Sequence, residues 1–248
     1  MTGRRVPLDD ALAYPAAKGR YVRRLFSTIA DRYDLITVLL SFGLDAGWKR
    51  LVVRLADPRP DQPALDLACG TGDIAFGLAS RGARVIGLDI THRMLQLARR
   101  RAQTESRPAR QTPNPLFVQG DMASLPFPAV AFDLVTTGYG LRNVPGLERA
   151  LNEIARVLRP GGTFVSLDFN RPASAVVRGI YLSYLRLVGG ALGWVLHRDP
   201  DTYRYIPASI ERYPGAPAVT QMILRAGFTS ATWRPVLGGL MAIHVARK

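Results

Sequence analysis

The stretch LDLACGTGD, residues 65–73, runs from an apolar segment into two glycines and ends on an acidic residue. In a doubly wound α/β sheet, ligands bind beyond the carboxyl ends of the strands, where the first glycine turn enters its helix. Gly70 and Gly72 allow the main chain to approach a ligand closely, and Asp89 ends the next expected strand. The 19 residues from Gly70 to Asp89 match the spacing of a carboxylate that holds ribose hydroxyls. The stretch therefore predicts a nucleoside-containing ligand, with or without phosphate.

Strand-like and helical segments alternate on both sides of this loop. Short apolar segments with helical patterns between them occur at 64–68, 84–89, 116–120, 132–138 and 163–169. This order gives right-handed crossovers and a parallel sheet. The last two segments, TSATWRPV and GLMAIHVA, are joined by Gly238 and Gly239, which predicts a hairpin and one antiparallel strand. We therefore expect a Rossmann-like, doubly wound, mostly parallel α/β sheet.

The 248 residues are enough for one domain with appended segments. Residues 1–20 are expected to be a poorly ordered N-terminus, and 21–248 a single domain with a helical cap at 21–57 and a substrate-side helical insertion at 172–215. The N-terminus has arginines without an apolar region, so we expect no secretory signal. The single cysteine, Cys69, fits a reducing cytoplasm.

The charge around the loop favours a ligand without phosphate. A pyrophosphate prefers a helix N-terminus free of negative charge, whereas Asp66, Asp73, Asp89 and Asp121 lie at or next to the expected strand ends. No lysine or arginine lies between residues 65 and 80. S-adenosylmethionine carries a sulfonium, an ammonium group and a ribose, and it suits such a pocket better than NAD does. The alternative for each acid is a helix cap or a solvated strand end.

Four further segments carry a family resemblance. They are FSTIADRYDLITVLLSFGLDAGWKR (26–50), QGDMASLPFP (119–128), GYGLRNV (138–144) and DTYRYIPASIERYPG (201–215). With them the chain resembles a class I S-adenosylmethionine-dependent methyltransferase, and more narrowly the UbiE/MenG family of quinone C-methyltransferases. The resemblance implies methylation of a ring carbon of a prenylated hydroquinone, most typically demethylmenaquinol, in menaquinone or ubiquinone biosynthesis.

The resemblance also implies cofactor positions. It places Thr71 in the glycine loop, Asp89 on the ribose, and Asp121 with Met122 beside the adenine. Where a serine usually precedes the family's aromatic-Gly-Leu-Arg-Asn segment, this chain has Gly138, so one hydrogen bond to the cofactor is expected to be missing or replaced by main chain. The full expected cofactor set is Asp66, Gly70, Thr71, Gly72, Asp89, Ile90, Asp121 and Met122.

Carbon methylation needs an electron-rich ring, which deprotonation of the neighbouring hydroxyl provides. Because a phenolic pKa starts at ~10, a cation or base nearby is needed at neutral pH. We expect Arg142 to stabilise the phenolate and Asn143 to orient the ring oxygen, with Asp121 as the third catalytic candidate. Arginine stays protonated and is not a free base. The alternative is a structural ion pair of Arg142 with Asp121 or Glu148.

Tyr33 and Tyr203 are expected to close the substrate pocket, with ordinary core packing as the alternative. Of the three histidines, His197 beside Asp199 is the one to test as another base. The histidines and Cys69 are too scattered for metal-ligand spacing, so no metal is expected.

The net charge of +14 indicates either coding bias or attraction to an anionic surface. The longest stretch of the insertion without an ionisable residue, 187–196, has ten residues, whereas a membrane span needs ~20. The insertion therefore predicts a core helix or an interfacial one that receives the isoprenoid tail. We expect a cytoplasmic protein that contacts an anionic membrane surface, and a homodimer is left open.

The alternative acceptors are another lipid-like or phenolic molecule and, less favoured, nucleic acid. The sequence contains no stripe of basic residues interleaved with aromatic residues, which would indicate nucleic-acid binding. In addition, TGYGLRN stands where a base-amino methyltransferase carries a Pro-Pro-aromatic segment.

Overall fold

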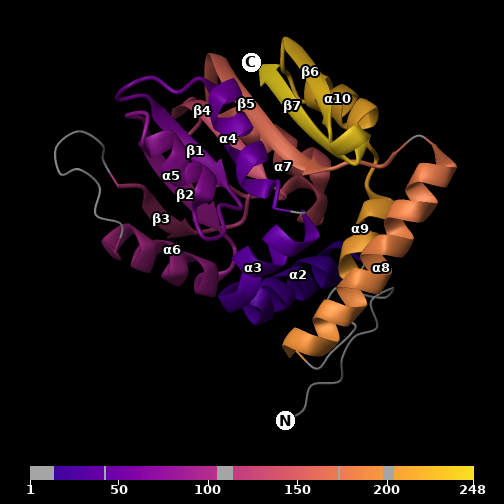
Figure 1. The fold of residues 1–248 in the computed structure, drawn as a ribbon. Coiled ribbons are helices and arrows are strands. Elements are labelled where there is room, and N and C mark those ends of the chain that lie inside the picture. Colours follow the sequence, from indigo (N-terminus) through magenta and orange to yellow (C-terminus); the bar gives the residue numbers. More distant parts are fainter. Residues whose placement is uncertain (1–13, 42, 105–113, 173, 198–203) are drawn as a thin grey trace.

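The computed structural model describes residues 14–41, 43–104, 114–172, 174–197 and 204–248. Within them, seven strands form one sheet in the order β3-β2-β1-β4-β5-β7-β6, and helices lie on both of its faces (Figure 1). The strands are β1 (Pro63–Leu67), β2 (Arg84–Asp89), β3 (Leu116–Gln119), β4 (Phe132–Gly138), β5 (Leu158–Phe169), β6 (Ser230–Val236) and β7 (Met241–Arg247). The α-helices are α2 (Pro15–Ile29), α3 (Tyr33–Leu40), α4 (Asp45–Ala56), α5 (Asp73–Ala79), α6 (His92–Thr104), α7 (Leu147–Val157), α8 (Ala175–His197), α9 (Tyr205–Arg212) and α10 (Ala216–Arg225).

The pairing of the strands confirms the expected fold class. Strand β1 pairs in parallel with β2 and β4, and the parallel sheet continues to β3 on one side and β5 on the other. Strand β7 is antiparallel to both of its neighbours, β5 and β6, and the hairpin β6–β7 provides this reversal. Because the strand order reverses between β1 and β4, the loops after these two strands diverge and open a crevice at the carboxyl edge of the sheet.

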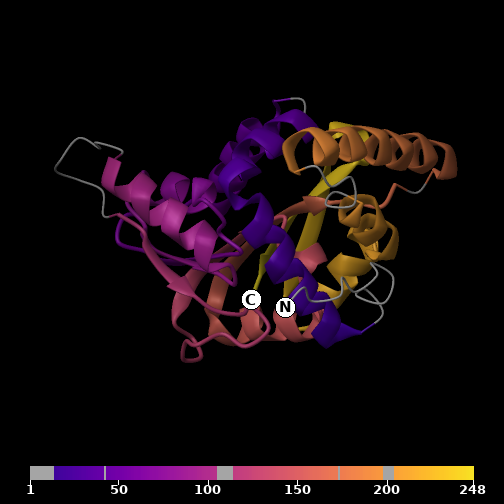
Figure 2. The ribbon, with the colours of Figure 1, turned by 90° about the horizontal axis from the view of Figure 1, so that it is seen from below.

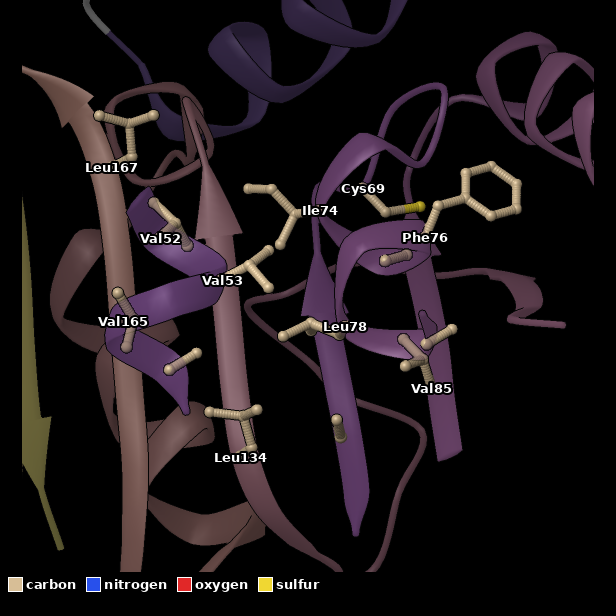
Figure 3. Close-up of a cluster of buried hydrophobic side chains, with 14 of the residues drawn as sticks. Val52, Val53, Cys69, Ile74, Phe76, Leu78, Val85, Leu134, Val165 and Leu167 are labelled. Atoms are coloured by element: carbon tan, nitrogen blue, oxygen red, sulfur yellow. The ribbon is translucent and has the colours of Figure 1, made fainter. Parts of the chain in front are cut away.

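Two apolar layers hold the helices against the sheet. On one face, Val52 and Val53 of α4 pack with Ile74 and Leu78 of α5 over the strands, in the cluster drawn in Figure 3. A Cβ at Gly77 would lie 2.8 Å from Cγ2 of Val53, so this glycine allows α4 and α5 to approach closely. On the other face, α7 and α10 bury a second cluster against the same strands. The sheet is therefore covered on both sides, as a parallel sheet requires.

The N-terminal helices and the insertion pack together as one cap. Tyr205 of α9 is buried among Val22, Leu25 and Ile36 of α2 and α3, and α8 packs on α9. Figure 2 shows the indigo N-terminal helices beside the orange helix α8, and α3 and α8 are in contact. None of the helices described is long and apolar enough to cross a membrane.

Two boundaries differ from the sequence expectation. Helix α2 begins at Pro15, so residues 15–20, expected to be poorly ordered, are helical. Nζ of Lys18 fixes this turn by donating to the carbonyl oxygens of Arg142 and Val144, at 3.0 and 2.7 Å. Strand β5, expected at 163–169, already begins at Leu158.

Candidate functional site

Two adjacent pockets lie at the carboxyl edge of the sheet. The loop pocket, about 690 Å³, is formed by the turns after β1, β2, β3 and β4 together with α2. The cap pocket, about 720 Å³, is formed by α2, α3, α8 and α9 over the end of β5. Phe26, Tyr33 and Tyr139 line both, so these three rings form the wall between the two pockets.

The glycine loop is tied to the end of β2. The N–H of Gly70 donates to Oδ2 of Asp89 at 2.9 Å, and the N–H of Thr91 donates to Oδ1 at 2.7 Å. Gly72 has φ +93°, and a Cβ there would lie 2.9 Å from the ring of Phe76. The loop therefore needs glycine at this position to enter α5.

Five of the eight expected cofactor residues line the loop pocket: Gly70, Asp89, Ile90, Asp121 and Met122. The other three, Asp66, Thr71 and Gly72, are not among its lining residues. The hydroxyl of Thr71 donates to Oδ1 of Asp34 at 2.9 Å, which ties the glycine loop to α3. Thr71 therefore connects the loop to the cap in this structure.

Asp66 is buried in β1, behind the glycine loop. Its Oδ1 accepts a hydrogen bond of 2.8 Å from the hydroxyl of Thr136 on β4. Burial raises the pKa of Asp66 to about 7, although the hydrogen bonds from Thr136 and the N–H of Ala75 oppose the shift. Its carboxyl group therefore changes protonation close to neutral pH.

Two cations from other helices reach Asp73 at the end of the glycine loop. Lys49 of α4 lies 2.8 Å from Oδ2 of Asp73, and Arg101 of α6 contacts Oδ1. Burial raises the pKa of Asp73, but the two cations outweigh this and hold it below its usual value. Only Asp89 and Asp121 of the four acids line the loop pocket. Neither cation belongs to residues 65–80, because α4 and α6 bring them to the loop from other parts of the sequence.

The turn after β4 crosses from one pocket to the other. A Cβ at Gly138 would lie 2.8 Å from Cδ1 of Ile74, so this isoleucine fills the space next to the position where the family usually has serine. Nδ2 of Asn143 donates to the carbonyl oxygen of Tyr139 at 2.7 Å, and its Oδ1 accepts from the hydroxyl of Tyr205 at 3.0 Å. Asn143 thus lines the loop pocket while it holds the turn against α9.

Arg142 lies in the cap pocket, buried and paired with Asp168 at the end of β5. Its Nε is 3.5 Å from Oδ1 of Asp168, its main-chain N–H donates to Oδ2 at 3.0 Å, and Nη1 donates to the hydroxyl of Ser209. The guanidinium also lies 4.8 Å from the centre of the Phe169 ring. The partners considered from the sequence, Asp121 and Glu148, are therefore wrong: the pairing residue is Asp168.

Of the remaining candidates from the sequence, some line the pockets and others do not. Burial raises the pKa of Tyr33, which lines both pockets, to about 12. Asp121 is exposed at the rim of the loop pocket. Tyr203 and the side chain of His197 lie outside what the structure describes. His244 is buried in β7 with Nε2 3.1 Å from the carbonyl oxygen of Ala216, and it lines neither pocket.

Sequence reasoning missed several residues at the site. The hydroxyl of Tyr139 donates to Oδ1 of Asp45 at 2.5 Å, and Lys49 lies 2.6 Å from Oδ2 of the same carboxylate. Tyr139 lies in the segment 138–144, three residues before Arg142, and this closeness in the sequence was the available signal. No spacing in the sequence connects it to Asp45, which is 94 residues away.

Comparisons with known proteins agree over most of the chain. Residues 15–248 match the model of the ubiE/COQ5 methyltransferase family. The demethylmenaquinone methyltransferase of Thermus thermophilus is 42% identical over 89% of this chain and 98% of its own length. The ubiquinone/menaquinone biosynthesis C-methyltransferase UbiE of Zymomonas mobilis is 38% identical over 93% of each chain.

Solved structures share the fold at low identity. A SAM-dependent methyltransferase of Thermotoga maritima, described as a possible histamine N-methyltransferase, aligns with a TM-score of 0.63 at 17% identity and covers 92% of this chain and 99% of its own. A SAM-dependent methyltransferase of Aquifex aeolicus aligns with a TM-score of 0.61 at 13% identity, over 89% and 97% of the two chains. At this identity the likeness shows the fold alone.

Proposed function

Because the chain belongs to the ubiE/COQ5 methyltransferase family, we propose that it is an S-adenosylmethionine-dependent C-methyltransferase of prenylated hydroquinones, with demethylmenaquinol as the first substrate to test. One observation carries this proposal. A pocket lined by carboxylates and main chain meets an apolar, aromatic pocket at the shared wall of Phe26, Tyr33 and Tyr139. The two reactants would therefore face one another across a narrow boundary, and the reaction becomes a matter of positioning.

The loop pocket fits S-adenosylmethionine better than a dinucleotide. Asp89 and Asp121 are its charged lining residues, and no lysine or arginine is among the described residues that line it. A pyrophosphate would find no cation there, whereas a ribose and a positively charged group would find carboxylate oxygens. When bound, S-adenosylmethionine supplies an electrophilic methyl group on a sulfonium.

The cap pocket fits a hydroquinone ring with an apolar tail. Its walls are mostly aliphatic and aromatic, including Leu25, Ile36, Trp48 and Phe169, and Arg142 is its one cation among the described lining residues. The guanidinium, held by Asp168 and Ser209, can stabilise a phenolate oxygen without taking its proton. We assign Arg142 this role, and Asn143 the role of holding the turn that carries it.

An exposed apolar face beside the cap pocket supports binding at a membrane surface. Ile180, Leu187 and Trp194 of α8 are 68%, 75% and 67% exposed, and they recur every seven residues along one line of the helix. The opposite side of α8 is buried on the cap. Leu35, Val38, Leu39 and Leu44, on α3 and just after it, are also exposed.

The charge of this region suits an anionic bilayer. Helices α2 and α8 contain basic residues and no acidic ones, and the whole chain carries +14. Basic residues near an anionic surface contribute ~1 kcal/mol each. We propose that the α3/α8 face, defined by the seven exposed residues above, lies on the cytoplasmic surface of the membrane, where a polyprenyl tail can pass directly into the cap pocket.

Titration calorimetry of the purified protein tests the first step. We expect S-adenosylmethionine and S-adenosylhomocysteine to bind and NAD not to bind, and an assay with reduced demethylmenaquinone to yield the methylated quinol. The same assay with a benzoquinol tests the second ring class, which the name of the Zymomonas relative suggests. Binding of NAD alone would overturn the proposal.

A further inference from the structure

A buried hydrogen-bonded pair, Tyr139 and Asp45, stands where the two pockets meet. Tyr139 follows β4 and lines both pockets, and Asp45 begins α4. Both residues are buried, and the hydroxyl of Tyr139 donates to Oδ1 of Asp45 at 2.5 Å. Burial and the neighbouring carboxylate of Asp45 raise the pKa of Tyr139 well above its usual value. The pair therefore rests as a neutral phenol on a carboxylate.

A line of charges leads from Asp45 toward the surface. Nζ of Lys49 lies 2.6 Å from Oδ2 of Asp45 and 2.8 Å from Oδ2 of Asp73. The side chain of Asp73 is 32% exposed and also contacts Arg101. The groups that face Asp45 are therefore Lys49 on its own helix, Tyr139 after β4 and Tyr33 on α3, with Asp73 and Arg101 beyond Lys49.

The reaction releases a proton that these pockets must accept. Replacing a ring C–H bond by C–CH₃ releases one proton overall, because the methyl donor changes from a sulfonium to a neutral thioether. Arg142 stays protonated and cannot take it. Asp168 is committed to Arg142, and no histidine is among the described lining residues of either pocket. Asp45 is the buried carboxylate that connects directly to the wall between them.

We propose that Asp45 is the proton acceptor of the reaction and that the hydroxyl of Tyr139 relays the proton to it. The inference rests on the proposed function. As the hydroquinone O–H bond breaks, its proton passes to Oη of Tyr139, and the proton of Tyr139 passes to Oδ1 of Asp45. The step ends with a phenolate on the ring beside Arg142, a neutral Tyr139 and a protonated Asp45. Lys49 then lies next to a neutral carboxylic acid and still pairs with Asp73.

The ionisation of a bound naphthol tests this relay without methyl transfer. The probe is 4-methoxy-1-naphthol, which has one ring hydroxyl, and its naphtholate is followed by absorbance as pH is varied. In the wild type we expect bound naphthol to ionise at a pH lower by about one unit or more than in Tyr139→Phe or Asp45→Asn. Tyr213→Phe is the matched control, because Tyr213 is a buried tyrosine that lines neither pocket.

Methyl transfer provides the second readout. Tyr139→Phe should lower kcat with demethylmenaquinol by about 10²-fold while the Kd for S-adenosylmethionine and the thermal unfolding temperature stay close to the wild type. If Asp45 accepts the proton, wild-type kcat should fall at acid pH, and the residual activity of Asp45→Asn should lack this fall. If Asp45 had only a structural role, Asp45→Asn would change the stability of the protein and keep the fall of activity at acid pH.

The outcomes separate the relay from the proposed function. A wild type that ionises the naphthol at lowered pH but does not methylate the quinol would support the relay and overturn the proposed substrate. Folded Tyr139→Phe that binds the naphthol and ionises it at the wild-type pH would overturn the relay. Failure of the folded wild type to bind the naphthol would overturn it as well.

Discussion

Arg142 and Asp168 form an ion pair of 3.5 Å, in which each side chain is only 4% exposed. Burial raises the pKa of Asp168, and the guanidinium of Arg142 with the N–H groups of Arg142 and Phe169 opposes this shift. Removing two charges from water is costly, and a buried pair of this kind is weak evidence for stability. The ion pair instead serves to position Arg142, because it holds the guanidinium against the cap pocket.

Asp168→Asn should destabilise the protein by about 3–5 kcal/mol, because Arg142 is left as a buried, unpaired charge. Urea unfolding monitored by circular dichroism measures this loss. Glu211→Gln is the control, since its partner Arg186 and Glu211 are both about half exposed and such pairs contribute about 0–1 kcal/mol. An apolar pair, Arg142→Met with Asp168→Leu, should recover stability but not methylation. Equal losses of unfolding free energy for Asp168→Asn and Glu211→Gln would contradict the role of Asp168 as the partner of a buried charge.

The repeating order of segments was sufficient to predict the sheet, since each apolar segment and each glycine turn acts locally. The glycine loop after β1 was predicted in the same way, and the N–H of Gly70 in this loop donates to Asp89 at the end of β2. The N-terminal boundary was wrong because residues 15–20 become helical through Lys18, which bonds to carbonyl groups more than a hundred residues away.

The charges of the site could not be predicted, because their partners come from other elements. In the sequence, Asp73 is an acidic residue with no cation near it. In the fold, Lys49 and Arg101 pair with its carboxylate. The segment around Arg142 singled this residue out, but its partner Asp168 is 26 residues away at the end of the next strand. Spacing indicates which residues share an edge of the sheet and does not indicate which of them pair.

Gly138→Ser should destabilise the protein by about 1–3 kcal/mol, although it introduces the residue that the family usually has. The new Cβ would lie 2.8 Å from Cδ1 of Ile74, a buried methyl group in the core, and inserting atoms into a packed core carries this cost. Ile74→Val removes that methyl group. In the double variant, the loss should be smaller than the sum of the two single losses, as measured by a double-mutant cycle in urea.

Additive losses in that cycle would contradict the contact between the two positions. Calorimetry with S-adenosylmethionine adds a functional readout. If Ile74 occupies space that the serine hydroxyl would otherwise use, the double variant should bind the cofactor at least as tightly as the wild type.

Asp66 should make stability depend on pH between about 4 and 7. Its pKa is raised by burial from an ordinary 3.8 to about 7, so in this window the folded protein keeps a proton that the unfolded chain releases. Stability therefore falls as pH rises through the window, and the cost is fully present above pH 7. Asp66→Asn carries no charge at any pH and lacks this dependence.

Urea unfolding of wild type and Asp66→Asn at pH 5, 6, 7 and 8 isolates this effect, because the other titrating groups cancel in the difference. The wild type should lose stability relative to the variant as pH rises, by up to about 4 kcal/mol across the full window. A difference that does not change with pH would show that Asp66 titrates as it does in the unfolded chain.

The α3/α8 face should insert into anionic vesicles. Trp194 is 67% exposed, whereas Trp48 is buried, so in a Trp233→Phe background Trp194 reports on the surface of α8. We expect its emission to shift to shorter wavelength with phosphatidylglycerol vesicles and much less with phosphatidylcholine, and added salt should weaken the binding. Leu187→Asp should lower vesicle binding at least about tenfold, because a buried leucine contributes about 1.5–3 kcal/mol.

Leu116→Asp is the matched control, because Leu116 is 67% exposed on β3, away from the cap. It should bind vesicles like the wild type, while Leu187→Asp should still methylate a short-chain quinol in detergent. If Leu187→Asp and Leu116→Asp bind vesicles equally well, the face is not the membrane contact. If Leu187→Asp instead converts a dimer into a monomer in solution, the exposed stripe pairs two copies of the chain, and the tail must reach the cap pocket by another route.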